Sequence, residues 1–227
     1  MTSVAASRVA ALIPAAGQGV RFGGELPKAF FEFAGLSLLA RSALALSTFA
    51  EIIVAAVPEN FVAAAARELE SVDAEVHIVV GGATRQDSVA AALRILPTDI
   101  DLVLIHDAAR PLVPQSVIGN VLTELRSGAQ AVIPVLPVSD TIKRVANNGI
   151  VLETVDRDSL RRVQTPQGFV RSVLVDALSE AIHVATDEAG LVEHFGVSVH
   201  TVAGSELAFK ITTPEDVSYG LFLLQEA

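Results

Sequence analysis

A glycine-rich stretch followed by two cations is the first part of this sequence that could do chemistry. The apolar run Val9–Ile13 leads into Pro14–Gly19 (PAAGQG), and Arg21 and Lys28 follow. Small residues let the main chain approach a ligand closely and direct its N–H groups at phosphate oxygens. The two cations add positive charge that main-chain amides cannot supply. Together these residues predict a loop that binds a triphosphate.

The glycine pattern does not match two common nucleotide-binding loops. No Gly-Lys-Ser/Thr follows Gly19, which excludes a Walker loop, and Phe22 stands where a dinucleotide fingerprint has its third glycine. A turn that only packs a strand against a helix remains an alternative for this stretch. Arg21 and Lys28 favour phosphate binding, because triphosphate chemistry needs cations on the leaving phosphates.

A second glycine turn, Gly81–Ser88 (GGATRQDS), follows another apolar run. Gly82 would allow a base or ribose to approach the main chain, and Ser88 could hydrogen-bond a base edge. The alternative is an ordinary strand-to-helix turn in which Thr84 or Ser88 caps the helix. The sequence of this turn alone does not decide between the two.

A sharper motif is His106–Pro111 (HDAARP), which places Asp107 directly after an apolar strand. A carboxylate at the end of a buried strand costs free energy unless it is paired or has a ligand. Beside a phosphate loop, it could hold Mg²⁺ for a metal-assisted phosphate reaction. The alternative is an ion pair between Asp107 and Arg110 within the turn. The five histidines lack the spacing of metal ligands and are interpreted as structural.

Composition narrows the class of protein. The 227 residues are 51% hydrophobic, which is ample for a buried core, and the absence of cysteine excludes disulfides and thiolate sites. A formal net charge of −10 argues against a general nucleic-acid binder. The N-terminal region has the pattern of neither a signal peptide nor a membrane span. We expect a soluble, cytoplasmic protein that binds neither nucleic acid nor membrane.

Alternating strands and helices must position these motifs. The expected strands are Val9–Pro14, Glu51–Val57, Val76–Val80, Leu102–His106 and Ala131–Val135, and the helices between them are Leu36–Thr48, Pro58–Ser71, Thr84–Leu96 and Pro114–Arg126. This alternation predicts an α/β fold with a mostly parallel sheet and flanking helices. If the strand order is 3-2-1-4-5, the first and fourth strands are neighbours and the glycine loop faces Asp107. We expect one domain over residues 1–227.

The segment 137–166 interrupts this rhythm and predicts a protruding β-hairpin. Polar residues alternate around Thr141 and Lys143, a turn signal follows at Asn147–Gly149, and Ile150–Val155 returns. An isolated two-stranded hairpin is marginally stable. It is therefore expected to dock on another surface, for which a second subunit is the natural candidate.

The C-terminal part resumes the alternation. Helices are expected over residues 171–183 and from Thr186, a plausible N-cap, to about Gly196, followed by a strand over Val197–Val202. Thr213–Asp216 (TPED) predicts the start of a last helix, with a cap residue, a first-turn proline and acids that favour the helix dipole.

As an ordered set, these motifs resemble those of the 2-C-methyl-D-erythritol 4-phosphate cytidylyltransferase family of the non-mevalonate isoprenoid pathway. The matching motifs are Pro14–Gly19 with Arg21, Pro27-Lys28, Gly81–Ser88, His106–Pro111, Asp140–Arg144, Thr154–Arg157, Thr165–Gln167, Thr186–Ala189 and Lys210–Thr212. The match runs from residue 9 to about residue 217. The resemblance implies a Rossmann-like nucleotidyltransferase fold, with the hairpin as an arm that is exchanged between the subunits of a homodimer.

The resemblance also implies a role for each motif residue. Ala15, Ala16, Gly17, Gly19, Gly82, Arg85, Ser88 and Ala108 would bind CTP. Arg21 and Lys28 would stabilise charge on the triphosphate, and Arg157 and Lys210 would position methylerythritol phosphate. Asp107 would lie near Mg²⁺ and the sugar phosphate, and Arg110, Thr141 and Thr186 would line the same pocket. Ala83 departs from the family, which often has an acid there, so a neighbouring main-chain group would have to supply that base or ribose contact.

The expected reaction is in-line attack of a sugar-phosphate oxygen on the α-phosphorus of CTP, catalysed by positioning and electrostatics. One alternative is the same chemistry on another alcohol phosphate, such as ribitol 5-phosphate. An alternative of a different class is a non-catalytic nucleotide-binding regulator. Arg21, Lys28, Asp107, Arg157 and Lys210 together argue against the regulator, which would not need both cationic pairs.

Overall fold

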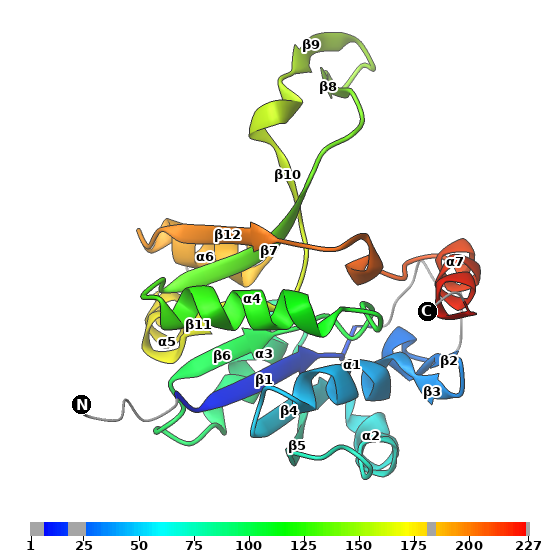
Figure 1. Ribbon diagram of the computed structural model, residues 1–227, viewed down its shortest axis with the longest axis vertical. Helices are drawn as coiled ribbons and strands as arrows, with labels where there is room; N and C mark the ends of the chain where they lie inside the picture. Colours follow the sequence, from blue (N-terminus) through cyan, green and yellow to red (C-terminus); the bar gives the residue numbers. More distant parts are fainter. Residues whose placement is uncertain (1–6, 18–25, 181–184, 226–227) are drawn as a thin grey trace.

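The computed structural model describes residues 7–17, 26–180 and 185–225. Within these ranges a central sheet has helices on both faces, and a hairpin projects from it (Figure 1). Its strands are β1 (Val9–Pro14), β4 (Ile52–Val57), β5 (Glu75–Val80), β6 (Leu102–Ile105), β7 (Ala131–Pro137), β10 (Arg161–Val163), β11 (Gln167–Val170) and β12 (Val199–Ala203). The helices are α1 (Leu38–Ser47), α2 (Val62–Glu68), α3 (Arg85–Arg94), α4 (Gln115–Arg126), α5 (Arg171–Ser179), α6 (Glu188–His194) and α7 (Pro214–Gln225).

The strand order is β5-β4-β1-β6-β11-β7-β10, and β12 pairs with β7. β1 pairs in parallel with both β4 and β6, so the predicted 3-2-1-4 part of the order is confirmed. The predicted place of the fifth strand beside the fourth is wrong, because antiparallel β11 lies between β6 and β7. This strand was not predicted. It has four residues, and its pairing partners are distant in sequence, so no local periodicity marks it.

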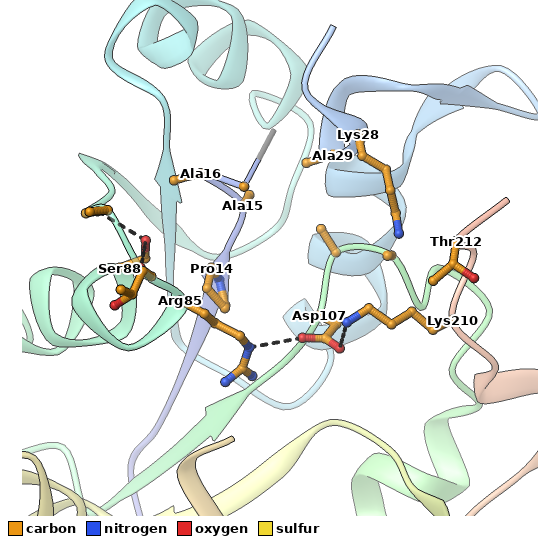
Figure 2. A pocket seen from close by; sticks show the side chains of 16 residues that line it. Pro14, Ala15, Ala16, Lys28, Ala29, Arg85, Ser88, Asp107, Lys210 and Thr212 are labelled. Atoms are coloured by element: carbon orange, nitrogen blue, oxygen red, sulfur yellow. Dashed lines mark hydrogen bonds and ion pairs between the residues drawn. The ribbon is translucent and has the colours of Figure 1, made fainter. Parts of the chain in front are cut away.

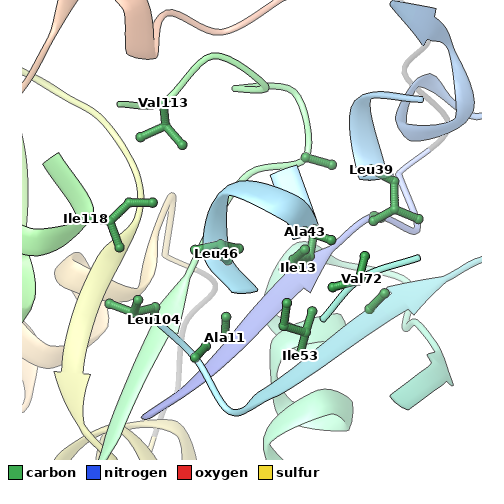
Figure 3. Close-up of a cluster of buried hydrophobic side chains, with 14 of the residues drawn as sticks. Ala11, Ile13, Leu39, Ala43, Leu46, Ile53, Val72, Leu104, Val113 and Ile118 are labelled. Atoms are coloured by element: carbon green, nitrogen blue, oxygen red, sulfur yellow. The ribbon is translucent and has the colours of Figure 1, made fainter. Parts of the chain in front are cut away.

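Side chains of the central strands alternate between two apolar cores. Ala11 and Ile13 of β1 point to the face covered by α1, α2 and α4, whereas Ala10 and Leu12 point to the face covered by α3, α5 and α6. Figure 3 shows part of the first core, in which Leu39, Ala43 and Leu46 of α1 meet the side chains of the strands. Burial on both faces explains why β1 and β4 are continuously apolar.

Several predicted element boundaries differ from the observed ones. The first helix begins at Leu38 after the short strand β3 (Leu36–Ser37), because the Ser37 side chain caps it. A 3-10 turn, Glu59–Phe61, precedes α2, and the helix ends at Glu68 rather than at Ser71. The cap of α6 is Asp187 and not Thr186, since the Asp187 carboxylate accepts from the Gly190 N–H. Residues 181–183 of the predicted fifth helix lie outside the described residues.

The predicted hairpin is present as β8 (Ile142–Val145) and β9 (Val151–Val155), which pair with each other in a separate two-stranded sheet. The hairpin projects away from the central sheet (Figure 1). A third, smaller core consists of Phe33, Leu38 and Ile211 and lies at β2 (Glu32–Phe33) and β3. Side chains of α7 pack against this core (Figure 1). No helix in the described part of the chain is both long and apolar enough to cross a membrane.

Candidate active site

A cavity of about 460 Å³ opens beyond the carboxyl ends of β1, β5 and β6. It is lined by Pro14, Ala15, Ala16, Gly17, Lys28, Ala29, Gly82, Ala83, Thr84, Arg85, Ser88, Asp107, Ala108, Ala109, Lys210 and Thr212. Figure 2 shows Lys28 and Lys210 entering this space from different segments, with Asp107 between Lys210 and Arg85. The three motifs and the late lysine, far apart in sequence, therefore share one cavity.

The two glycine turns form one wall because they pack against each other. A Cβ built at Gly81 would lie 2.4 Å from the Ala16 Cβ of the first turn. Within the second turn, a Cβ at Gly82 would lie 2.2 Å from the Asp87 Cβ. Only glycine fits at either position without a shift of the main chain. The Ala15 N–H donates to the Ala56 carbonyl at 2.7 Å and fixes the start of the first loop.

The second turn is also a helix cap, as its alternative interpretation predicted. Thr84 and Asp87 form a capping box at the start of α3. The Ser88 hydroxyl accepts from the Gly82 N–H at 3.1 Å and donates to the Thr84 carbonyl at 3.0 Å. The hydroxyl hydrogen of Ser88 is thus used within the turn, so the Ser88 oxygen could bond a base edge only as an acceptor.

Three cations surround the carboxylate of Asp107. Its oxygens lie 3.0 Å from Lys210 Nζ, 3.4 Å from Arg85 Nε and 3.6 Å from Arg110 Nε. Burial alone would raise the pKa of this carboxyl, but the three positive charges hold that pKa well below its usual range. Asp107 is therefore ionised and holds the three cations together. The predicted Asp107–Arg110 pair exists, and Asp107 also lines the cavity.

Glu188 is a second, more deeply buried carboxylate in this network. Its side chain is 1% exposed and pairs with Arg85 Nη1. Burial raises the pKa of the Glu188 carboxyl, although Arg85 opposes that rise. Arg85 thus bridges Asp107 and Glu188 and links the start of α3 to the start of α6.

His106 holds the Asp107 turn from behind. Its Nε2 lies 3.2 Å from the Arg110 carbonyl oxygen, so this nitrogen carries the hydrogen and donates. Its Nδ1 then accepts from the Thr165 hydroxyl at 3.0 Å, and the same hydroxyl accepts from the Asp107 N–H at 3.1 Å. Complete burial lowers the pKa of His106 to about 4, so the ring is neutral near pH 7. This is the structural role predicted for the histidines, at the edge of the site.

Asp107 is the one carboxylate that lines the cavity in the part of the chain that the structure describes. No described group of three His, Cys, Asp or Glu side chains could hold a metal ion alone. Mg²⁺ is commonly held by one or two carboxylates together with substrate phosphates and water. The donor set therefore fits a Mg²⁺ that is bound mainly through the nucleotide.

Other predicted site residues lie elsewhere. Arg110 contacts Asp107 from behind and donates to the Ala208 carbonyl at 2.6 Å. Thr141 and Arg157 belong to the projecting hairpin and its return, where Arg157 donates to the Ser139 carbonyl, and Thr186 precedes α6. These four do not line the cavity of this single chain. Gly19 and Arg21 lie outside the described residues.

Sequence reasoning missed Glu188, Thr165 and Thr212 as parts of the site. Each stands in a motif noted for other reasons, namely Thr186–Ala189, Thr165–Gln167 and Lys210–Thr212. Their proximity to Asp107 or to the cavity depends on the packing of distant segments, which no local pattern reports.

The sequence model of the 2-C-methyl-D-erythritol 4-phosphate cytidylyltransferases matches residues 9–226. The chain belongs to this family. A family protein of Rhodococcus jostii is 48% identical over 220 residues, covering 96% of each chain. A family protein of Saccharopolyspora erythraea is 50% identical over 216 residues, covering 92% of this chain and 96% of the other. Membership confirms the resemblance and makes the protein a nucleotidyltransferase.

Solved structures of the family have the same architecture. The 2-C-methyl-D-erythritol 4-phosphate cytidylyltransferase of Thermus thermophilus has a TM-score of 0.81 at 36% identity, covering 96% of this chain and 99% of that one. The 4-diphosphocytidyl-2C-methyl-D-erythritol synthase of Anaerococcus prevotii has a TM-score of 0.84 at 27% identity with the same coverages. The predicted α/β nucleotidyltransferase fold is thereby confirmed.

Proposed function

We propose that this protein transfers CMP from CTP to 2-C-methyl-D-erythritol 4-phosphate, forming 4-diphosphocytidyl-2-C-methyl-D-erythritol and pyrophosphate for isoprenoid biosynthesis. Family membership supports the substrates. The observation that carries the chemistry is the entry of Lys28 and Lys210 into one cavity from different segments, with Asp107 bound to Lys210. Two polyanions can be held together only where cations reach both of them.

The reaction needs no protein nucleophile. An acceptor phosphate oxygen attacks the α-phosphorus of CTP, a new P–O bond forms, and the bond to the bridging oxygen breaks. Pyrophosphate leaves with that electron pair. The attacking phosphate is already an anion, so no general base is needed.

The residues divide between the two substrates. We assign Lys28 and Arg21 to the triphosphate, where they oppose the charge that grows on pyrophosphate. The small residues Ala15, Ala16, Gly17, Gly19, Gly82 and Ala108, with Arg85 and Ser88, form the nucleotide side. Lys210, Arg110, Thr186 and, from a partner's arm, Thr141 and Arg157 form the acceptor side.

Asp107 has two tasks in this proposal. It fixes the Lys210 ammonium through the 3.0 Å ion pair. It is also the side chain that would hold Mg²⁺ against the nucleotide phosphates. When bound, the metal supplies positive charge that screens the triphosphate from the acceptor phosphate.

Pyrophosphate release with CTP, Mg²⁺ and methylerythritol phosphate tests the function directly. Lys28→Ala should lower kcat by on the order of 10²-fold, because it removes a transition-state contact. Lys210→Ala should cripple turnover while CTP affinity stays nearly unchanged. Unchanged turnover in Lys28→Ala, or loss of CTP affinity in Lys210→Ala, would contradict the assigned sides.

The acceptor is tested in the same assay. Ribitol 5-phosphate, the alternative acceptor, should release pyrophosphate far more slowly than methylerythritol phosphate at equal concentration. Faster release with ribitol 5-phosphate would support the same transfer reaction with ribitol 5-phosphate as the acceptor.

The proposal also includes a single domain over residues 1–227, a homodimer formed through the arm at residues 137–166, and a cytoplasmic location.

A further inference from the structure

Gln164 is a buried polar residue that does not line the cavity. The residue is 4% exposed and stands between β10 and β11, where its main-chain N–H donates to the Pro134 carbonyl of β7 at 2.8 Å. The adjacent Thr165 is equally buried and binds the Asp107 N–H. A buried amide needs partners for both its donor and its acceptor.

Both partners of the Gln164 amide belong to one residue of a distant segment. Gln164 Nε2 donates to the Ser205 carbonyl at 2.8 Å, and Gln164 Oε1 accepts from the Ser205 N–H at 3.0 Å. The side chain thus pairs with main chain as a neighbouring strand would. A Cβ built at Gly204 would lie 2.3 Å from Oε1, so the contact requires glycine beside it.

The segment that begins at Ser205 carries Lys210. After Ser205, the Ala208 carbonyl accepts from Arg110 Nη1 at 2.6 Å, and the Ile211 N–H donates to the Ala109 carbonyl at 2.8 Å. Arg110 and Ala109, which hold Ala208 and Ile211, both belong to the Asp107 turn. Gln164, which holds Ser205, comes from the chain that returns from the hairpin.

Consecutive residues therefore hold the two halves of the Lys210–Asp107 ion pair. Thr165 binds the main chain of Asp107 at 3.1 Å, and Gln164 binds the segment whose lysine meets that carboxylate. We propose that Gln164 is a positioning residue that sets the place of the Lys210 ammonium relative to Asp107 and the acceptor phosphate. The proposal rests on the assignment of Lys210 to the acceptor.

Gln164→Met tests this role, because methionine keeps the length of the side chain and removes both hydrogen bonds. A displacement of about 1 Å at a positioning group can cost up to about 10²-fold in rate. We expect kcat/KM for the acceptor phosphate to fall about 10-fold or more, with CTP affinity within about twofold of the wild type. Unchanged acceptor kcat/KM in a folded variant would overturn the proposal.

A double-mutant cycle with Lys210→Ala separates positioning from general loss of structure. If Gln164 acts through Lys210, Gln164→Met should lower kcat/KM less than about twofold in the Lys210→Ala background, measured at raised enzyme concentration. The full effect, about 10-fold, in that background would sink the proposal. Absence of pyrophosphate release from the wild-type protein would instead contradict the proposed function, so the two failures are distinguishable.

Gln167→Met is the matched control for this cycle. It removes a similar pair of bonds from another buried glutamine, which binds Asp187 and the Ala189 N–H of α6. Those bonds hold α6 and not the segment that carries Lys210. Any loss of kcat/KM caused by Gln167→Met should therefore be equal in the wild-type and Lys210→Ala backgrounds.

If Gln164→Met fails to fold, Gly204→Ala tests the same role of Gln164. The added methyl group displaces the Gln164 amide from the other side, because it would meet Oε1 at 2.3 Å. The variant should reproduce both the loss of kcat/KM and the non-additivity with Lys210→Ala. An additive effect of Gly204→Ala would overturn the proposal.

Discussion

His106 makes the stability of the protein depend on pH at the scale of a single residue. Burial lowers its pKa to about 4, below the value of about 6.5 in an unfolded chain. Between these two pH values the unfolded chain binds a proton that the folded chain does not. The free energy of unfolding is therefore unaffected by His106 above about pH 6.5 and falls as the pH drops toward 4.

We expect the free energy of unfolding to be about 3 kcal/mol lower near pH 4 than near pH 6.5 because of this residue. Urea denaturation at several pH values measures it. His106→Gln, whose amide can still donate to the Arg110 carbonyl, should flatten the difference between about pH 6.5 and about pH 4.5. An equally steep dependence in the variant would show that other groups cause it.

Arg85 is the cation that Glu188 depends on. Arg85→Leu leaves the Glu188 carboxylate, 1% exposed, without its partner, and loss of one member of a buried pair costs about 3–5 kcal/mol. The folded-state pKa of Glu188 is already raised, so the unpaired acid is tolerated best when protonated.

The destabilisation by Arg85→Leu should therefore be smaller at about pH 5 than at about pH 7, as measured by urea denaturation against the wild type at each pH. Adding Glu188→Gln should restore part of the loss near neutral pH. An equal loss at both pH values would contradict this account of the pair.

At the scale of elements, β11 is joined to α4 by a contact that only glycine permits. A Cβ built at Gly168 would lie 2.5 Å from Val121 Cγ1 and 2.8 Å from Leu125 Cδ1. Gly168→Ala should lower the unfolding free energy by about 1–3 kcal/mol, because the packed side chains of Val121 and Leu125 must move to admit the methyl group. Chemical denaturation measures the change.

Gly119→Ala, within α4, is the matched control. Its Cβ would lie 3.8 Å from Phe49 Cε1, an ordinary contact, so helix propensity decides and stability should rise by up to about 1 kcal/mol. If Gly168→Ala were as stable as Gly119→Ala, the close packing of β11 on α4 would be wrong.

At the scale of the whole molecule, the arm leaves apolar side chains in water. Ile150 is 61% exposed and Leu152 is 62% exposed, on a hairpin whose strands pair only with each other in the described part of the chain. In the proposed homodimer, a second copy of the chain would cover these side chains and would also receive Arg157. We expect a dimer in solution, and Ile150→Asp with Leu152→Asp should give a monomer with greatly reduced turnover.

Sedimentation of the wild type and the double variant measures this. Ile95→Asp, at an exposed apolar position after α3, is the control and should leave the oligomeric state unchanged. A monomeric wild type, or a dimeric double variant, would contradict the role of the arm.

Local patterns of the sequence determined the central strands, the helices between them and the glycine turns. Continuous apolar runs such as Val9–Ile13 are typical of strands buried on both faces, and Thr84 with Asp87 is a cap that the chain encodes within a single helical turn. The family could be identified for the same reason, because its motifs are short and local.

Tertiary structure alone decided which of these motifs meet. Antiparallel β11 separates β6 from β7, and Lys210 reaches Asp107 because distant anchors hold its segment. Asp107 and Glu188 share Arg85 across three segments that no sequence spacing relates. Hydrogen bonds and ion pairs between such segments depend on the packing of the whole sheet, so the sequence identified Asp107, Lys28 and Lys210, whereas Glu188 and Thr165 joined the site only through the fold.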